Sequence, residues 1–295
     1  MTQQPLVSVV VPTHNMARFV AEAVTSVLNQ THRNLEVHVV DDGSTDNPRE
    51  AVLPLMSDPR VVFHSQPNGG QAKAKNRGIR ASRGEFIAFL DADDLWVPDK
   101  IEKQLPQFTR PEIGVVYTNY RWIDINGVLM PTPPVAPRDG RITNELFVTN
   151  FVTGMASIVR RECFDAVGVF NESLPMSIDW DLWLRISSKY EFKYFDYVTY
   201  LYRQWPGQMS KNFETRFHCA VRVMKQFLDE HPGLIEPSTA SLAWAHTYSG
   251  FGENLRYAGR FRDAMRSYAD ALRVRPTYLP AWKGLVRCVQ MHSQS

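Results

Sequence analysis

The stretch GEFIAFLDADDLW, residues 84–96, decides the fold class of this chain. Its apolar run, from Glu85 to Leu90, predicts a buried strand, and three carboxylates follow within four residues at Asp91, Asp93 and Asp94. Carboxylates this close repel one another, so the fold has to supply a counter-charge. Open α/β sheets bind their ligands at the carboxyl ends of strands, and this cluster follows a strand end.

Strand and helix signals alternate around this stretch. β-Branched runs predict strands at residues 6–11, 35–40, 60–64 and 113–117. Helical spacing predicts helices at residues 16–28, 46–55 and 71–82, another from residue 98, and a later one at about 214–228. The order predicts an α/β fold with a mainly parallel central sheet and helices on both faces. Polar clusters at residues 12–15, 41–42 and 91–94 all fall at strand ends, which predicts a ligand site there.

Composition limits the classes of function. The chain has 295 residues, 44% hydrophobic and 22% charged, with a net charge of +2, so it has no electrostatic signature of a nucleic-acid binder. Its three cysteines fit no CxxC pattern, and we expect free thiols in a reducing compartment. We find no signal peptide and no apolar run of the ~20 residues that a membrane span needs. We therefore expect a cytoplasmic protein, with docking at the inner face of the membrane left open.

The sequence changes character after about residue 235, where it becomes Ala-rich and helical. A 34-residue shift places Tyr248 on Trp282 and Phe251 on Leu285, as in the tetratricopeptide pattern of paired antiparallel helices. We predict two domains, residues 1–235 and a small all-α extension at residues 236–295. Such a short repeat can pack against the first domain, bind a protein partner or self-associate, and the sequence leaves these alternatives open.

The carboxylate cluster suits a divalent cation. Mg²⁺ or Mn²⁺ takes one or two carboxylates and completes its shell with substrate phosphates and water. The alternative is a solvated turn whose Asp residues cap the next helix, and we expect that structural role for Asp94. The chain has no GxGxxG or GxxxxGK[ST] motif, so phosphates would be held by the metal and by Lys73, Lys75 or Arg77. Those cations could equally form the solvated face of a helix.

A second acidic pair, Asp41-Asp42, ends the strand at residues 35–40. A carboxylate there can accept hydrogen bonds from a nucleotide base or ribose, although DDGS is also a turn signal. Asp179 opens a later predicted helix, where the helix dipole by itself favours a carboxylate. A Pro-rich segment at residues 131–140 predicts an exposed loop.

Six ordered motifs resemble the inverting glycosyltransferases of family 2, which have the GT-A fold. They are PTHN (12–15), VVDDGSTD (39–46), NGGQAKAKNRGI (68–79), GEFIAFLDADDLWVPDKIEKQL (84–105), IDWDLWLR (178–185) and YRQWPGQMS (202–210). The resemblance covers roughly residues 5–210.

The resemblance implies roles for individual residues. Asp42 matches the residue that contacts the nucleotide base, and Asp179 matches the catalytic base that deprotonates the acceptor hydroxyl. Asp93 would bind the metal that bridges the donor diphosphate, and Asp91 would lie near the ribose. The remaining candidates are Pro12, Thr13, Asn15 and Lys75 for the nucleotide, and Trp180 and Trp205 for the acceptor or sugar.

Three positions depart from the family pattern. Ile178 stands where the family often has Glu, and Lys75 stands where Arg is common, which keeps the charge but not bidentate phosphate contact. Trp205 replaces a frequent His that would serve the diphosphate or metal. Trp205 could stack on a sugar or simply pack.

The motifs together predict a metal-dependent, inverting glycosyltransferase. It would move a sugar from a nucleoside diphosphate, with UDP expected, to a hydroxyl of a saccharide or other acceptor. Two alternatives stay open: an inactive nucleotide-sugar-binding scaffold, and a nucleotidyltransferase that releases pyrophosphate.

Overall fold

The computed structural model describes residues 4–134, 137–208 and 212–292. Parts of the predicted loop 131–140 and the last two residues of the YRQWPGQMS motif lie outside these ranges. The chain divides into two compact units: unit 1 is Met1–Ile142 with Phe151–Gln208, and unit 2 is Thr143–Asn150 with Met209–Ser295. By this division the predicted helix at about residues 214–228 groups with the C-terminal helices. The domain boundary at residue 235 stays a prediction.

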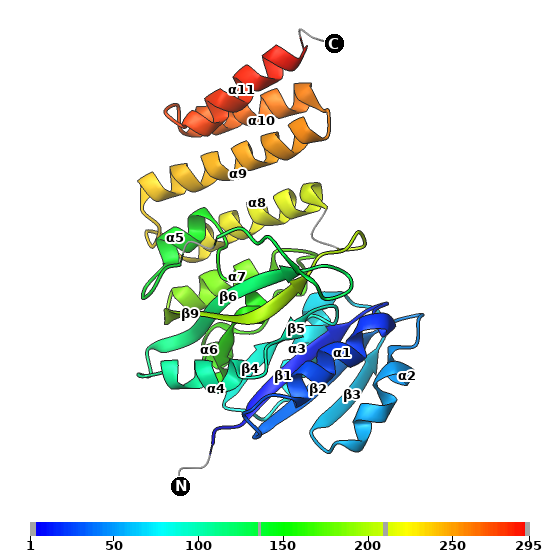
Figure 1. The fold of residues 1–295 in the computed structure, drawn as a ribbon. Coiled ribbons are helices and arrows are strands. Elements are labelled where there is room, and N and C mark those ends of the chain that lie inside the picture. The colour runs from blue at the N-terminus through cyan, green and yellow to red at the C-terminus, as the bar shows by residue number, and fades with distance from the viewer. Residues whose placement is uncertain (1–3, 135–136, 209–211, 293–295) are drawn as a thin grey trace. The chain divides into compact units, whose positions relative to one another are not determined.

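Unit 1 is built on a mixed nine-stranded sheet (Figure 1). Its strands are β1 Val7–Thr13, β2 Leu35–Asp42, β3 Val61–Gln66, β4 Phe86–Phe89, β5 Leu95–Trp96, β6 Ile113–Ile123, β7 Leu129–Met130, β8 Ile158–Arg160 and β9 Glu191–Arg203. The order across the sheet is β3-β2-β1-β4-β8-β6-β9-β5, with β7 paired to β6. The helices of unit 1 are α1 Ala17–Leu28, α2 Pro48–Val52, α3 Gln71–Ala81, α4 Lys100–Gln104, α6 Arg161–Val167 and α7 Ile178–Ser187, with short 3₁₀ helices η1 Leu53–Ser57, η2 Leu105–Gln107 and η3 Gly154–Ala156.

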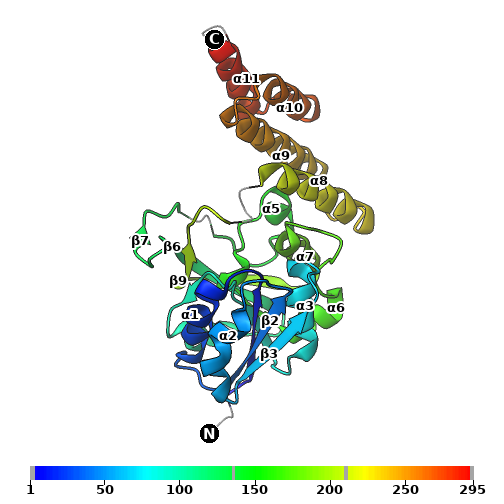
Figure 2. The same cartoon turned by 90° about the vertical axis from the view of Figure 1, so that its right-hand side faces the viewer.

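The first four strands form the parallel half of the sheet, as predicted. Every residue of β1, β2 and β4 is buried, because helices cover both faces of this half. Figure 2 shows α1 and α2 on one side of β2 and β3, and α3 and α6 on the other. The continuous apolar sequence of these strands therefore follows from burial on both faces.

The second half of the sheet contains antiparallel pairs. β8 lies between β4 and β6 and runs antiparallel to both, and the long β9 pairs in parallel with β6 and antiparallel with β5. β6 extends six residues beyond the predicted end at Tyr117. The sequence analysis did not predict β8 or β9.

The parallel register brings the polar clusters to one edge. Thr13 pairs with Asp41 across β1 and β2, and Asp42 pairs with Gln66 across β2 and β3. Phe89, just before the carboxylate cluster, pairs with Val10. The strand ends that carry candidate site residues are thus neighbours in the sheet.

A buried carboxylate fixes the opposite edge of this half. Glu36 of β2 accepts hydrogen bonds from Ser8 Oγ at 2.7 Å and from the backbone N–H of Arg83 at 2.6 Å. The Arg83 guanidinium also donates to it, at 3.0 Å. Burial acts to raise the pKa of Glu36, but these hydrogen bonds outweigh it and lower the pKa to about 2.

Unit 2 is entirely helical among the described residues. Its helices are α5 Thr143–Val148, α8 Phe213–Glu230, α9 Pro237–Tyr257, α10 Phe261–Val274 and α11 Leu279–His292. Figure 1 shows α9, α10 and α11 packed side by side, and an apolar core lies among them. The residues of that core include Ala245, Leu255, Ala264, Tyr268, Ala271, Ala281 and Cys288.

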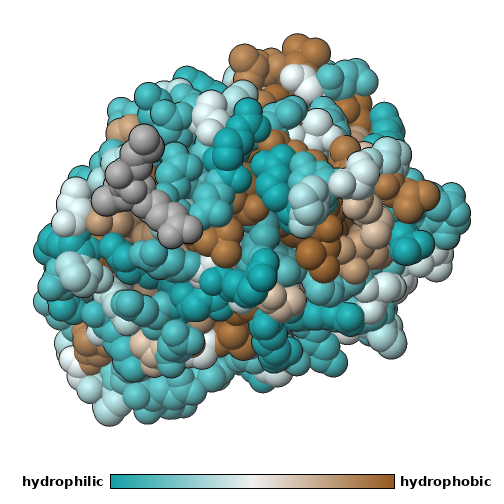
Figure 3. All heavy atoms as spheres, turned by 90° about the horizontal axis from the view of Figure 1, so that it is seen from below, coloured by the Kyte–Doolittle hydropathy of each residue, from teal (hydrophilic) through white to brown (hydrophobic). Residues whose placement is uncertain are grey.

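No helix in the described part of the chain combines the length and apolar character needed to span a bilayer. The face drawn in Figure 3 is mainly hydrophilic, with groups of hydrophobic residues between the polar ones. Cys163, Cys219 and Cys288 are buried free thiols.

Candidate active site

Asp42 organises the loop that follows β3. Its Oδ1 accepts hydrogen bonds from the N–H of Gly69 at 2.9 Å and from Gln66 Nε2 at 2.7 Å, and its Oδ2 accepts one from the N–H of Gly70 at 2.7 Å. The carboxylate is only 3% exposed, so these donors replace the water that it loses. Gly43 lies beside this loop with a φ of +73°, and a Cβ there would be 2.6 Å from the backbone nitrogen of Asn68. Asp42 and Gly43 together bring residues 66–70 against the end of β2.

The loop after β1 is tied to the loop after β2. Asn15 adopts a left-handed backbone conformation with φ 54°. Its Oδ1 accepts a hydrogen bond of 2.8 Å from Thr45 N, and its own N–H donates to Ser44 Oγ at 2.9 Å. Pro12 and Thr13 are buried beneath it. Thr13 Oγ1 is buried and has no hydrogen-bond partner among the described residues, which leaves its donor and acceptor capacity unused.

The start of α3 connects the two acidic clusters. Gly70 donates to Asp42, and the next residue, Gln71, donates from Nε2 to Asp91 Oδ1 at 3.2 Å. The start of α3 therefore links Asp42, at the end of β2, to Asp91, which follows β4 and is 49 positions later in the sequence.

The counter-charge of Asp91 is Lys75. The Nζ of Lys75 lies 3.3 Å from Asp91 Oδ1, and the Lys75 side chain is only 2% exposed. Phe89 and Phe170 surround the ammonium group, with ring centroids 5.8 and 5.7 Å from Nζ. A buried ammonium needs a carboxylate or an anionic ligand, which makes this pair an electrostatic anchor at the end of β4.

Asp93 is held by Trp205, one of the three residues expected to depart from the family pattern. The indole Nε1 of Trp205 donates to Asp93 Oδ2 at 2.8 Å, and the Trp205 ring packs against Phe19 at a centroid distance of 5.7 Å. Burial raises the pKa of Asp93, the Trp205 hydrogen bond lowers it, and the nearby charge of Asp91 raises it again. The Trp205 ring is thus fixed by Asp93 and Phe19 in this structure.

Asp94 has a structural role, but not the predicted one of capping the next helix from a solvated turn. It is 1% exposed and accepts hydrogen bonds from the Tyr200 hydroxyl and from the N–H of Arg203 at 2.7 Å. Burial raises its pKa well above the ordinary value. The carboxyl group therefore fastens the turn after β4 to β9.

Arg203 holds the same turn from the other side, and the sequence analysis missed it. Its Nε donates to the carbonyl oxygen of Asp93 at 2.7 Å, and one terminal nitrogen donates to the carbonyl of Ile125 at 2.9 Å. The other terminal nitrogen pairs with Glu22 at 2.8 Å. The signal that could have found it was an arginine at the end of the aromatic run YVTYLYR, because an arginine buried there requires several acceptors.

Gly154 and Met155 of η3 connect the carboxylate cluster to α7. The sulfur of Met155 lies 3.9 Å from Lys75 Nζ, and its carbonyl accepts a hydrogen bond from Trp96 Nε1 at 3.0 Å. A Cβ added to Gly154 would lie 3.8 Å from the Cβ of Asp179. The predicted catalytic base and the Lys75–Asp91 pair thus both lie next to η3.

Asp179 occupies the first turn of α7, behind a strained residue. Ser177, the N-cap, has φ 58°, a left-handed conformation that is uncommon for a residue other than Gly or Asn. Asp179 Oδ1 accepts a hydrogen bond of 2.9 Å from the N–H of Trp180. This position at a helix N-terminus stabilises the ionised carboxylate.

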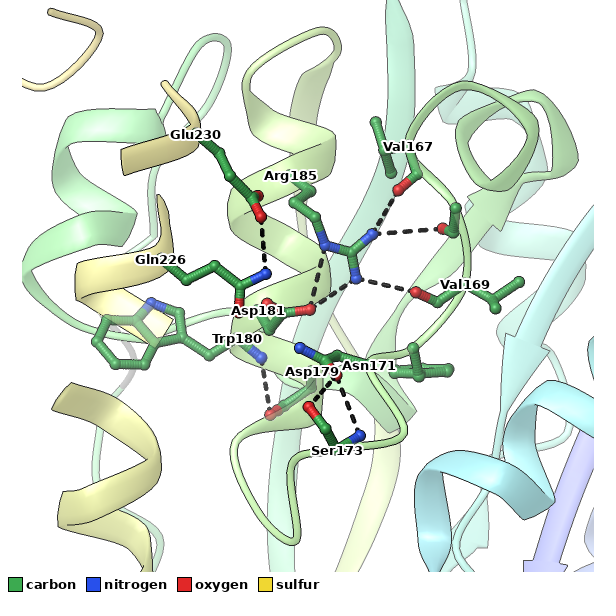
Figure 4. Close-up of polar contacts among 12 residues, drawn as sticks. Val167, Val169, Asn171, Ser173, Asp179, Trp180, Asp181, Arg185, Gln226 and Glu230 are labelled. Carbon is green, nitrogen blue, oxygen red and sulfur yellow. Dashed lines mark hydrogen bonds and ion pairs between the residues drawn. The ribbon is translucent and has the colours of Figure 1, made fainter. Parts of the chain in front are cut away.

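Asp181, two residues after Asp179 in α7, has a structural role. It pairs with Arg185 at 2.7 Å, and Arg185 also donates to the carbonyl oxygens of Val167 at 2.6 Å and Val169 at 2.9 Å (Figure 4). This network fastens α7 to the loop after α6.

The tryptophans of α7 are buried to different degrees. Trp183 is fully buried and packs edge-on against Phe192 at 6.1 Å, so it belongs to the core. Trp180, a candidate for acceptor contact, is 6% exposed.

The basic residues of α3 face two different environments. Lys75 points inward to Asp91, whereas Lys73 and Arg77 line an open cleft of about 380 Å³. The cleft is also lined by Asn68, Gly69, Arg80 and Glu172. Of the three cations predicted to hold phosphates, only Lys75 contacts the carboxylate cluster.

The donor set at the end of β4 is compatible with a divalent cation. Asp91 and Asp93 offer the hard oxygen ligands that Mn²⁺ and Mg²⁺ prefer, and Asp93 Oδ1 lies outside the Trp205 hydrogen bond. No group of three or more His, Cys, Asp or Glu suited to a metal occurs among the described residues. Two carboxylates are enough where substrate phosphates and water complete the shell.

A mixed sheet of this order, with an acidic cluster at the end of β4, defines the GT-A class of fold. Residues 1–349 of TarS from S. aureus have the same fold, with a TM-score of 0.68 at 17% identity, covering 98% of this chain and 91% of that one. The mannosyltransferase PcManGT from Pyrobaculum calidifontis, solved with GDP-Man and Mn²⁺, gives a TM-score of 0.67 at 21% identity, covering 98% of this chain and 81% of that one.

The chain belongs to glycosyl transferase family 2, whose family model matches residues 8–168. An uncharacterized glycosyltransferase of Rickettsia felis is 32% identical over 188 residues, 62% of this chain and 31% of that protein. The chondroitin synthase of Pasteurella multocida is 33% identical over 198 residues, 66% of this chain and 20% of that protein. This chain thus matches about a third or less of the length of these two relatives.

Proposed function

We propose that this protein is a metal-dependent, inverting glycosyltransferase that moves a sugar from a nucleoside diphosphate to a hydroxyl acceptor. The observation that carries the proposal is the arrangement around η3. Met155 of this turn contacts the buried Lys75 that pairs with Asp91, and Gly154 lies beside Asp179. Asp93 follows Asp91 by two residues. Membership of glycosyl transferase family 2 supports the same chemistry.

On this proposal, the donor binds along the carboxyl ends of β1, β2 and β4. Asp42 contacts the base while it holds loop 66–70, and Pro12, Thr13 and Asn15 form the rest of that pocket. Asp91 lies near the ribose, and Lys75 supplies positive charge toward the phosphates. UDP is the proposed nucleotide, since TarS, a fold neighbour, has been solved with UDP-GlcNAc.

Asp93 would hold Mn²⁺ or Mg²⁺ at the diphosphate, with substrate phosphates and water completing the shell. The cation, when bound, neutralises the charge that develops on the departing nucleoside diphosphate. Asp179 removes the proton from the acceptor hydroxyl, which requires about 2.6–3.2 Å between the two oxygens. A single displacement with one base inverts the anomeric centre. Trp180 and Trp205 are proposed to border the sugar or the acceptor.

The helical extension is part of the proposal. The 34-residue offset between α9 and α11 supports a tetratricopeptide-like arrangement of residues 236–295, which suits contact with a protein partner. A cytoplasmic location and contact with the inner membrane face stay predictions.

The experiment is a transfer assay with Mn²⁺, a panel of nucleoside diphosphate sugars and saccharide acceptors. We expect release of nucleoside diphosphate and an inverted product, both abolished by Asp93→Asn. Donor binding without turnover on a broad acceptor panel would instead favour the inactive scaffold. Release of pyrophosphate from a nucleoside triphosphate would favour a nucleotidyltransferase.

A further inference from the structure

One face of α11 is apolar and open to solvent. Leu279 is 67% exposed, Trp282 51%, Val286 53% and Val289 60%. Their spacing of three and four residues places them on a single helix face, here named the α11 stripe. Single exposed apolar residues are ordinary, but a continuous stripe that includes a tryptophan marks an interaction surface.

The opposite face of α11 packs within unit 2. Ala281 and Cys288 are fully buried, and Gly284 lies against Tyr268 of α10, where an added Cβ would be only 2.2 Å from the ring. The helix is therefore fixed on one side, and the α11 stripe is the side that remains uncovered among the described residues.

The equivalent face of α9 shows what covers such a stripe. The 34-residue offset places Leu279, Trp282, Val286 and Val289 on Ala245, Tyr248, Gly252 and Leu255. Ala245 is fully buried and Leu255 is 1% exposed. The atoms nearest to a Cβ on Gly252 are in the Tyr268 ring, at 3.0 Å, and the Ala264 carbonyl, at 3.2 Å. Both belong to α10, so α10 covers on α9 the face that is open on α11.

α10, the helix that covers this face of α9, has a contact face of small and aromatic side chains. α10 presents Ala264, Tyr268 and Ala271 as fully buried residues, so small side chains and one aromatic ring form its contact face. Five of its other eleven residues are charged, and the helix is strongly amphipathic. A helix of this pattern has the right shape for the α11 stripe.

Charge selects among the possible occupants. Residues 279–292 contain Lys283 and Arg287 but no carboxylate, and helical spacing places both cations on one border of the α11 stripe. Arg287 pairs with Glu253 of α9 at 3.6 Å. Two copies pairing antiparallel through this face would bring basic borders together, and in a parallel pair α11 would still offer no carboxylate to them. Acidic residues on a different helix would complement these cations.

We propose that the α11 stripe is the docking surface for an acidic, amphipathic helix of a partner protein. That helix packs on α11 in the way that α10 packs on α9, with its carboxylates beside Lys283 and Arg287. The surface lies within unit 2, and its test needs no transferase activity.

The experiment uses the full chain and a fluorescent synthetic peptide. The peptide has the sequence of residues 261–274 with Arg262→Glu, Arg266→Glu and Arg273→Glu, which keeps the contact face of α10 and the half-buried Asp263 and Asp270 at its border, and removes the cations of its outer face. Fluorescence anisotropy should give a Kd below about 100 µM. Val286→Glu and Lys283→Glu in the protein should each weaken binding at least about tenfold, or ~1.4 kcal/mol. Ser238→Glu, an exposed change in the first turn of α9, is the matched control and should leave the Kd unchanged.

Circular dichroism and thermal unfolding show whether the variants fold, which we expect because the changed side chains are exposed. No binding at about 100 µM peptide, or equal binding by Val286→Glu, overturns the proposal. Self-association in sedimentation that Val286→Glu abolishes would make a second copy the occupant. The protein could also bind anionic phosphatidylserine vesicles. If Val286→Glu abolishes this binding and the vesicles compete with the peptide, the occupant of the α11 stripe is a membrane. Either result overturns the proposal that a partner helix binds there.

Discussion

The indole Nε1 of Trp205 donates a 2.8 Å hydrogen bond to Oδ2 of Asp93. The two residues are 112 positions apart in the sequence, and they meet because Arg203 and Asp94 fasten the end of β9 to the turn after β4. Trp205 thus acts on the carboxylate that is proposed to bind the cation, although its side chain is a poor metal ligand. It orients Asp93 and favours its ionised form.

Trp205→Phe should weaken binding of UDP in the presence of Mn²⁺ by about three- to tenfold at pH 6, since one hydrogen bond to a carboxylate is lost. The pKa of Asp93 should rise further, because the Trp205 hydrogen bond lowers it. The defect should therefore shrink as the pH rises and Asp93 ionises in both proteins. Isothermal titration calorimetry at several pH values measures it, with Trp244→Phe of α9 as the control. A pH-independent defect would contradict this account.

Asp179→Asn and Asp181→Asn should separate chemistry from structure. Asp179→Asn should lower the transfer rate by about 10²- to 10⁴-fold and leave donor affinity unchanged, because general-base catalysis is lost. Asp181→Asn should instead lower the free energy of unfolding by about 1–3 kcal/mol, because Arg185 loses its carboxylate partner. Steady-state kinetics and urea unfolding of both variants test this. Equal transfer rates in Asp179→Asn and wild type would remove Asp179 from the mechanism.

Arg203→Lys should lower the free energy of unfolding by about 2–4 kcal/mol. A lysine cannot reach Glu22 and the carbonyls of Asp93 and Ile125 together, because it lacks the planar fork of donors. Arg121→Lys, at an exposed position of β6, is the matched control and should change the unfolding free energy by less than about 0.5 kcal/mol. Similar urea midpoints for the two variants would show that the Arg203 contacts contribute little.

Glu36→Gln should reduce stability by about 1–3 kcal/mol at pH 7, since the Arg83 and Ser8 donors lose a charged acceptor. The pKa of Glu36 in the folded protein is about 2, below its ordinary value of 4.5, so its contribution is complete above pH 4.5. It is lost as the pH falls from about 4.5 to 2. The difference in thermal midpoint between wild type and Glu36→Gln should therefore shrink across that range. A difference in thermal midpoint that stays constant over this pH range would refute the lowered pKa of Glu36.

The parallel half of the sheet could be read from the sequence because it is covered on both faces. Burial on both faces demands an uninterrupted apolar run, as in VSVVVP at residues 7–12, and such runs are visible without a structure. β9 could not be predicted in this way. Its residues are mostly only partly buried, and polar and aromatic residues alternate irregularly along it. Its pairing partner β6 lies about 80 residues earlier.

The sequence by itself determined the chemistry available to this protein. It placed the carboxylates Asp42, Asp91, Asp93 and Asp179 at strand ends and a helix start, and its motifs indicated the family that residues 8–168 then matched. Local spacing encodes such features, because strand periodicity and turn residues act over a few positions.

Only the tertiary structure decided the partners of those carboxylates. Lys75 pairs with Asp91, Trp205 with Asp93, and Tyr200 with Asp94. A buried charge needs a neighbour in space, and sheet pairing brings that neighbour from anywhere in the chain. The counter-charge of the DADD cluster is therefore shared between a buried lysine and hydrogen-bond donors of β9 and the residues after it, which no local pattern specifies.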